Sequence, residues 1–195
     1  MTDSSPTTAA QHLDRFYVKQ RITMMVNRYE IREANPDGSE GRVIAIAQQK
    51  RMAFREQVTF YADEARTQAV FSFRARQALD LAAVYDVTDG AGTTLGSFQK
   101  DFAASLLRSS FHLTGEGIDA YGQERNQVIA LIRRFVDLPL PFHFDFTDRE
   151  SGRVVMSSER QLSLRDRYTV SVHDTRLDFR LAAAMAVGLD ALLAR

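Results

Sequence analysis

The sequence consists mainly of short runs in which apolar and polar residues alternate. In one of these runs, Val170 and Val172 alternate with Thr169 and Ser171. A period of two is typical of a strand with one face buried and the other face exposed. Similar runs recur over most of the chain, so the pattern predicts a mainly β fold of antiparallel strands.

The alternating runs form an internal repeat. Three segments begin at Tyr29, Tyr85 and Phe144, at spacings of 56 and 59 residues. Each segment consists of an aromatic-led strand, an acidic and Gly-containing turn and a second strand, and each is followed by another β-rich stretch. Three units of about four strands give about twelve strands, a number that usually closes or curls a sheet. We therefore expect a closed antiparallel barrel, which has no exposed edge to aggregate.

One stretch between the second and third repeats follows a helical pattern. Val128, Leu131, Ile132 and Phe135 fall at positions i, i+3, i+4 and i+7, which is the spacing of one helical face. Pro139 marks the end of this stretch. The pattern predicts a short amphipathic helix that covers one end of the sheet.

The last segment predicts a second helix, opened by Thr175 and Asp178 in the arrangement of a capping box. No residue from Leu181 to Leu189 is polar, and a helix that is apolar on all sides has to be buried. A membrane tail is the alternative, but Asp190 interrupts the run, which is shorter than the about 20 apolar residues that cross a bilayer. We expect this helix at the centre of the barrel, with four large side chains in the core: Leu181, Met185, Leu189 and Leu192.

Length and composition set the limits of the domain. A chain of 195 residues fits one domain, which we place at 12–195 after a disordered lead at 1–11. The lead has no basic region followed by an apolar one, so it does not resemble a signal peptide. Because the chain has no cysteine, disulfides and thiolate chemistry are excluded and a reducing compartment is favoured. The expected location is the cytoplasm.

The charge of the chain is balanced. The 25 basic and 25 acidic residues give a formal net charge of zero, so no long-range field draws the protein to nucleic acid or to a membrane. The absence of tryptophan and of a basic stripe with interleaved aromatic residues argues against nucleic-acid binding. Any anion-binding site has to be local.

Two local basic clusters are candidates for phosphate or lipid binding. Arg74 and Arg76 lie two residues apart in an alternating run, so they share one face of a strand while Phe73 takes the other. Arginine forks match the oxygens of a phosphate group. The second cluster contains Lys50 and Arg51. The alternative is that all four are ordinary solvated residues.

The sequence carries none of the common catalytic motifs. It contains neither G-x-S-x-G nor H-E-x-x-H, and the glycines of residues 89–96 do not fit the dinucleotide-binding pattern. The four histidines are scattered, and no segment supplies oxygen ligands at the alternate positions that a calcium loop requires. We expect no catalytic residue, no metal site and no cofactor.

Besides the terminal helix, six segments are typical of one known family: VKQR, MMVNRYEI, QKRMAFREQVTFYADE, FSFRARQALD, YDVTDGAGTTLGSFQKD and SLLRSS. Through them the chain resembles the tubby C-terminal superfamily from about Arg15 to its end, and within it the bacterial LURP-one-related and phospholipid scramblase-like proteins. The resemblance implies a non-enzymatic domain with a twelve-stranded barrel around a central helix, and association with phospholipids or phosphoinositides.

Two functions remain open at this point. The first is peripheral binding to an anionic phospholipid surface, at the inner face of the membrane, through the local arginine clusters. The second is a protein-interaction or scaffold domain that binds a protein partner with the outer surface of the barrel.

Overall fold

The computed structural model describes residues 11–22, 26–50, 57–77, 83–101, 110–126, 143–161 and 167–193. Within these ranges the chain forms twelve strands and the helix α2 (Phe179–Leu193). The strands are β1 (Arg15–Ile22), β2 (Val26–Ala34), β3 (Glu40–Lys50), β4 (Gln57–Tyr61), β5 (Ala69–Ala75), β6 (Val84–Asp89), β7 (Thr94–Asp101), β8 (Ser110–Gly115), β9 (Ile118–Glu124), β10 (His143–Asp148), β11 (Val154–Gln161) and β12 (Arg167–Val172).

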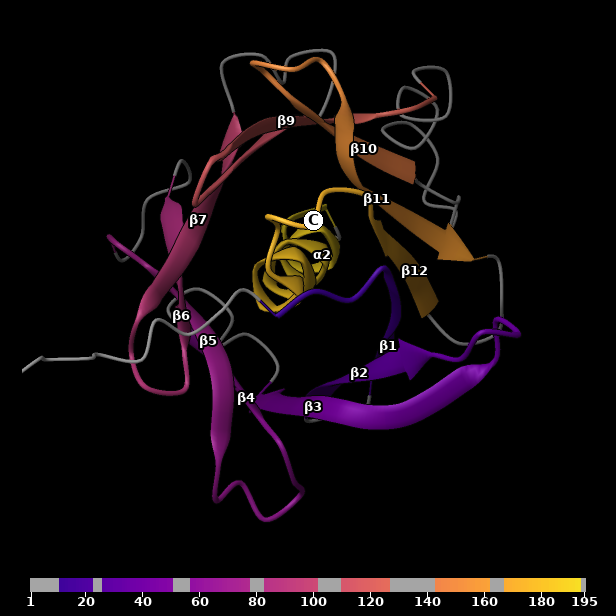
Figure 1. Ribbon diagram of the computed structural model, residues 1–195. Coiled ribbons are helices and arrows are strands. Elements are labelled where there is room, and N and C mark those ends of the chain that lie inside the picture. Colours follow the sequence, from indigo (N-terminus) through magenta and orange to yellow (C-terminus); the bar gives the residue numbers. More distant parts are fainter. Residues whose placement is uncertain are drawn as a thin grey trace, which may run out of the picture.

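The strands form one closed antiparallel barrel in which every strand lies beside its neighbours in the chain (Figure 1). The barrel closes where β1 pairs with β12, with Arg15 opposite Ser171 and Lys19 opposite Arg167. The prediction of a mainly β, twelve-stranded closed barrel around a C-terminal helix is therefore confirmed. The amphipathic helix expected around residues 128–135 lies outside the described residues.

The three repeated segments of the sequence are the hairpins β2–β3, β6–β7 and β10–β11. An acidic residue organises the turn in each of the last two. Asp89 Oδ1 accepts hydrogen bonds from the backbone N–H groups of Ala91 (2.9 Å) and Thr93 (2.8 Å). Asp148 Oδ2 accepts one from the N–H of Ser151 (2.9 Å). These aspartates therefore stabilise the turns, because each carboxylate accepts hydrogen bonds from backbone N–H groups that have no partner in the strand ladder.

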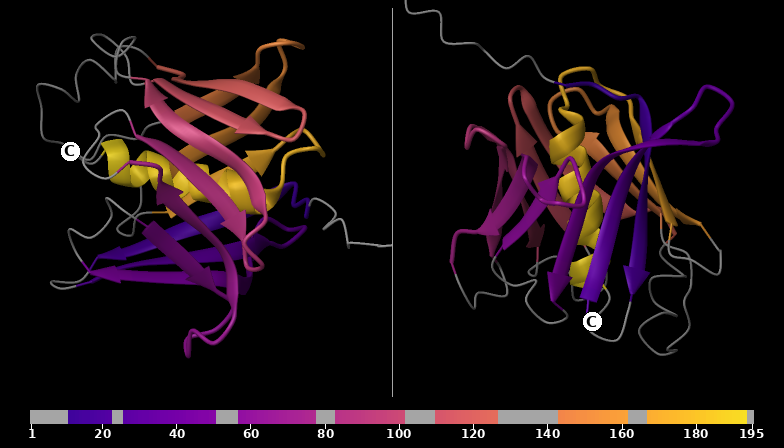
Figure 2. Two further views of the ribbon diagram at one scale, coloured as in Figure 1. Left: turned by 90° about the vertical axis from the view of Figure 1, so that its left-hand side faces the viewer. Right: turned by 90° about the horizontal axis from the view of Figure 1, so that it is seen from below.

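Helix α2 runs along the interior of the barrel, surrounded by the sheet (Figures 1 and 2). Every residue from Phe179 to Asp190 is buried. Leu181, Met185 and Leu189 are at most 1% exposed. Leu192, the fourth expected core residue, is only partly buried, because it belongs to the last turn of the helix. The membrane-tail alternative is wrong for this segment, since the sheet encloses it.

Small residues let the helix approach the barrel wall closely. A Cβ atom at Gly188 of α2 would lie 2.6 Å from the ring of Phe98 on β7. A Cβ atom at Gly96, also on β7, would lie 2.2 Å from the backbone carbonyl oxygen of Thr114 and 2.7 Å from Cδ2 of Leu181. None of these distances leaves room for a side chain, so glycine is required on both surfaces where α2 meets β7.

A carboxylate on the helix is matched by two tyrosines inside the barrel. The hydroxyl of Tyr29 on β2 donates a hydrogen bond to Asp190 Oδ2 at 3.2 Å, and the hydroxyl of Tyr168 on β12 donates one to Asp190 Oδ1. A buried carboxylate requires such partners to offset the loss of water. The single polar interruption of the apolar run therefore joins the helix to two strands of the wall.

The helix begins three residues later than a capping box opened by Thr175 would place it. Asp178 itself is the N-cap, because its Oδ1 accepts the backbone N–H of Arg180 at 2.8 Å. The carbonyl of Gln11 accepts the N–H of Phe179 at 2.8 Å, and the N–H of Gln11 donates to Asp178 Oδ2 at 3.1 Å. The capping-box prediction is wrong because a backbone group from the other end of the chain serves the first helical turn.

No helix within the described ranges combines the length and the apolar character that crossing a bilayer requires.

The central position of α2 predicts a large effect of Leu189→Ala on stability. Removing this buried side chain leaves a cavity and should lower the free energy of unfolding by about 2–5 kcal/mol. Leu192→Ala is the matched control, because it removes the same atoms from a partly buried position and should cost less. Urea denaturation followed by circular dichroism measures both variants. Equal losses would contradict the placement of the helix.

Candidate functional site

The outer face of β5 and β6 carries the first candidate cluster. On β5, Phe71 and Phe73 are fully buried in the core, whereas Ser72 is half-buried and Arg74 is exposed. Arg76 follows the last residue of β5 and is also exposed. The alternation of the strand thus places both arginines outside the barrel.

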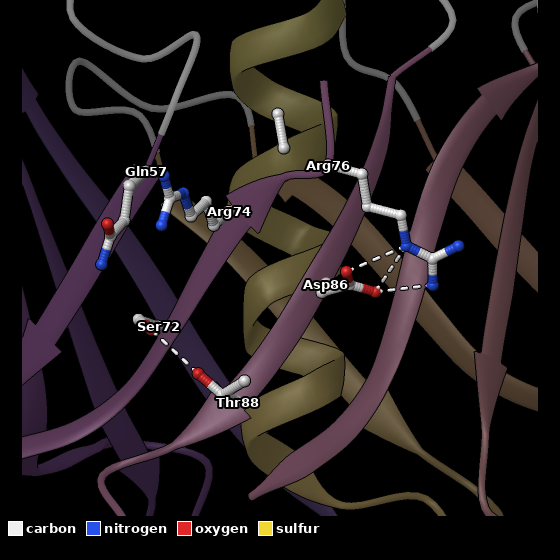
Figure 3. A pocket seen from close by; sticks show the side chains of 7 residues that line it. Gln57, Ser72, Arg74, Arg76, Asp86 and Thr88 are labelled. Carbon is white, nitrogen blue, oxygen red and sulfur yellow. Dashed lines mark hydrogen bonds and ion pairs between the residues drawn. The ribbon is translucent and has the colours of Figure 1, made fainter. Parts of the chain in front are cut away.

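The two arginines line one open surface pocket of about 740 Å³ (Figure 3). The pocket spans the start of β4, the second half of β5 and the middle of β6. Its lining residues are Gln57, Ser72, Arg74, Ala75, Arg76, Asp86 and Thr88.

Arg76 is bound to a carboxylate across the pocket. Its Nε donates to Asp86 Oδ1 at 3.0 Å and to Oδ2 at 2.9 Å, and its Nη2 donates to Oδ1 at 2.7 Å. This hydrogen bonding to Asp86 raises the pKa of Arg76 above its ordinary value. The positive charge of Arg76 is therefore compensated inside the pocket.

Arg74 differs from Arg76 in its charge environment. Its strand neighbours are Gln57 on β4 and Asp86 on β6. In Figure 3 its guanidinium lies toward Gln57, away from Arg76 and Asp86. Within the described ranges Arg74 has no carboxylate within ion-pair distance, so among the described lining residues it is the arginine that is not bound to a carboxylate.

Neutral hydrogen-bonding groups complete the lining. The hydroxyl oxygens of Ser72 and Thr88 are 3.1 Å apart, on neighbouring strands. The side-chain amide of Gln57 donates to Thr59 Oγ1 at 3.3 Å. Hydroxyl, amide and guanidinium groups are all donors to the oxygens of an anion. The arrangement can therefore bind a phosphate or carboxylate group at Arg74.

Some of the other exposed arginines on the barrel have acidic partners. Arg42 pairs with Glu33 at 2.6 Å on the β2–β3 hairpin. Arg125 pairs with Asp145 at 2.7 Å and with Glu159 at 2.9 Å. An arginine already bound to a carboxylate has less to gain from an incoming anion, so these two are weaker anion-binding candidates than Arg74.

The second candidate cluster is only partly described. Lys50 is the last residue of β3 and lies opposite Val26 of β2. The strand β4 separates it from β5. Arg51 lies outside the described residues, so the predicted role of this pair stays a prediction.

A second pocket, of about 510 Å³, lies where α2 begins, and Arg76 and Asp86 line it as well. Its other arginine, Arg176, pairs with Asp174 at 2.7 Å and donates to the carbonyl of Gly117 at 2.7 Å. Within the described part of its lining, both arginines are thus already bound to carboxylates.

Metal ligands do not gather in the described part of the chain, where no three histidine or acidic side chains are placed to hold an ion. His112, for example, pairs with Asp119 on the neighbouring strand β9.

The sequence did not indicate the four other polar lining residues, which are Gln57, Ser72, Asp86 and Thr88. Asp86 directly follows the aromatic residue that opens the second repeat, and it lies opposite Arg74 only because β5 and β6 pair in the observed register. The sequence does not show which residues of β5 and β6 lie opposite each other. Asp86 could therefore not be assigned to Arg74 in advance.

A closed twelve-stranded antiparallel barrel that encloses an apolar C-terminal helix defines a tubby-like protein. The chain belongs to the LURP-one-related family of this superfamily, whose family profile matches residues 43–190 and so covers more than half of the sequence. The resemblance seen in the sequence is confirmed at this level. A comparison with curated proteins finds no match.

The exposure of the Arg76–Asp86 pair predicts that breaking it leaves the fold intact. The side chains are 56% and 35% exposed, and exposed ion pairs contribute little to stability. Arg76→Gln and Asp86→Asn should therefore keep the melting temperature of the unmodified protein in differential scanning calorimetry. A clear drop in either variant would assign the pair a structural role.

Proposed function

We propose that this tubby-like barrel is a non-enzymatic domain that binds anionic phospholipid surfaces reversibly, at the cytoplasmic face of a membrane. The observation that carries the proposal is Arg74, an exposed guanidinium without a carboxylate partner among the described residues, beside the hydroxyls of Ser72 and Thr88. Guanidinium groups match the oxygens of a phosphate headgroup.

The balanced charge of the chain supports weak rather than permanent attachment. A basic residue near an anionic membrane contributes about 1 kcal/mol, and the net charge of zero adds no long-range attraction. Binding through Arg74 is then measurable at low ionic strength and lost at high ionic strength, where salt screens exposed charges.

A protein-interaction domain is the second candidate, and the surface gives it less support. Val154, at 40% exposure, is the one large apolar side chain exposed within the described ranges. The centres of stable protein interfaces are rich in aromatic and other apolar anchors. The described surface instead carries polar side chains and ion pairs, which favours a charged ligand over a protein partner.

Substitution of Arg74 is the direct test of lipid binding. Flotation with vesicles of phosphatidylcholine and phosphatidylserine at low salt should recover the unmodified protein with the vesicles, and Arg74→Glu should lose most of this binding. The matched control is Arg153→Glu, which makes the same charge change at an exposed position between β10 and β11, across the barrel from β5.

Three outcomes decide between the candidates. Loss of binding in Arg74→Glu alone supports the proposal. An equal loss of vesicle binding in both variants shows that only the net charge matters. It rejects the pocket as the binding site. An unmodified protein that fails to float at low salt rejects lipid binding and leaves the protein-interaction function.

A further inference from the structure

Three charged side chains line the described part of the pocket. Arg74 and Arg76 are the cations and Asp86 is the anion, so these three side chains together carry one positive charge. Asp86 uses both carboxylate oxygens, and Arg76 uses Nε and Nη2, in their contact. An arriving anion therefore meets one available guanidinium and one occupied guanidinium.

Asp86 acts on the pocket through Arg76. Arg74 and Asp86 are directly opposite each other on β5 and β6, but the guanidinium of Arg74 lies toward Gln57 (Figure 3). The carboxylate of Asp86 is instead bound to Arg76. An anion held at Arg74 therefore finds the second guanidinium of the pocket already occupied.

We infer that Asp86 is a specificity-determining residue, which limits the pocket to phosphate groups with one negative charge. A phosphodiester such as the headgroup of phosphatidylglycerol matches the single positive charge of the pocket. A phosphomonoester carries a second charge, which is left without a partner because Asp86 occupies Arg76. This inference rests on the proposed function, because it assigns the chemical class of the ligand at the same site.

The same phosphodiester chemistry exists in soluble molecules and in lipids, so the sources have to be separated. Soluble glycerophosphoglycerol, compared with sodium chloride at the same ionic strength, should displace the protein from phosphatidylglycerol vesicles if the pocket recognises the headgroup. Displacement by both to the same extent shows screening alone and overturns a headgroup pocket.

The variant Asp86→Asn tests the specificity directly. Vesicles containing phosphatidylglycerol or phosphatidic acid are prepared with equal electrophoretic mobility at about pH 8, where a phosphomonoester is close to doubly charged because its second pKa is about 6. The unmodified protein should bind phosphatidylglycerol at least as well as phosphatidic acid. Asp86→Asn frees Arg76 and should raise binding to phosphatidic acid about fivefold, with a smaller gain for phosphatidylglycerol.

Glu33→Gln is the matched control. Glu33 holds Arg42 in an exposed ion pair on the β2–β3 hairpin, so this variant makes the same net-charge change and also releases one arginine, outside the pocket. It should raise binding to both vesicles by the same factor. An equal change of lipid preference in Asp86→Asn and Glu33→Gln overturns the inference, as does a preference of the unmodified protein for phosphatidic acid.

Different results would overturn this inference and the proposed lipid binding. If Arg74→Glu abolishes vesicle binding but Asp86→Asn leaves the lipid preference unchanged, the proposed function stands and the role of Asp86 falls. If the unmodified protein binds neither vesicle, both fall together.

Discussion

The burial of an apolar helix is the constraint on which the structure depends. Helix α2 has no polar face to offer water, so the sheet has to enclose it on all sides. Each strand consequently directs apolar side chains inward, and glycine stands at two places where helix and wall approach each other closely, Gly96 and Gly188. The polar residues that can meet a ligand are left on the outer face, which is where the candidate pocket lies.

The outer face balances its charges locally. Cross-strand ion pairs such as Arg42–Glu33 and Arg125–Asp145 neutralise arginines in place, in agreement with the zero net charge of the chain. A surface of this kind attracts no polyanion from a distance. Such a surface binds an anion where an arginine is not paired with a carboxylate. Arg74 is such a position, because its acidic strand neighbour, Asp86, is bound to Arg76.

Local periodicity made the barrel and the helix predictable, because alternation and the apolar run are visible in neighbouring residues. The residues that line the pocket were harder to predict from the sequence. Arg74 could be assigned to an outer face, but its meeting with Asp86 depends on a register that loops between strands determine. The start of α2 was misplaced for a related reason: its first N–H groups are served by Asp178 and by the carbonyl of Gln11, a residue 168 positions away from Phe179.

The order of elements along the chain has a consequence for biosynthesis. Helix α2 follows all twelve strands, and β1 cannot close the wall until β12 has been made. A growing chain on the ribosome therefore exposes the apolar inner faces of its strands until the last segment emerges. Contacts between distant parts of a chain also form slowly. The helix that fills the finished barrel is thus the last of the described elements to be made, and the strands made before it have no core to cover until it is present.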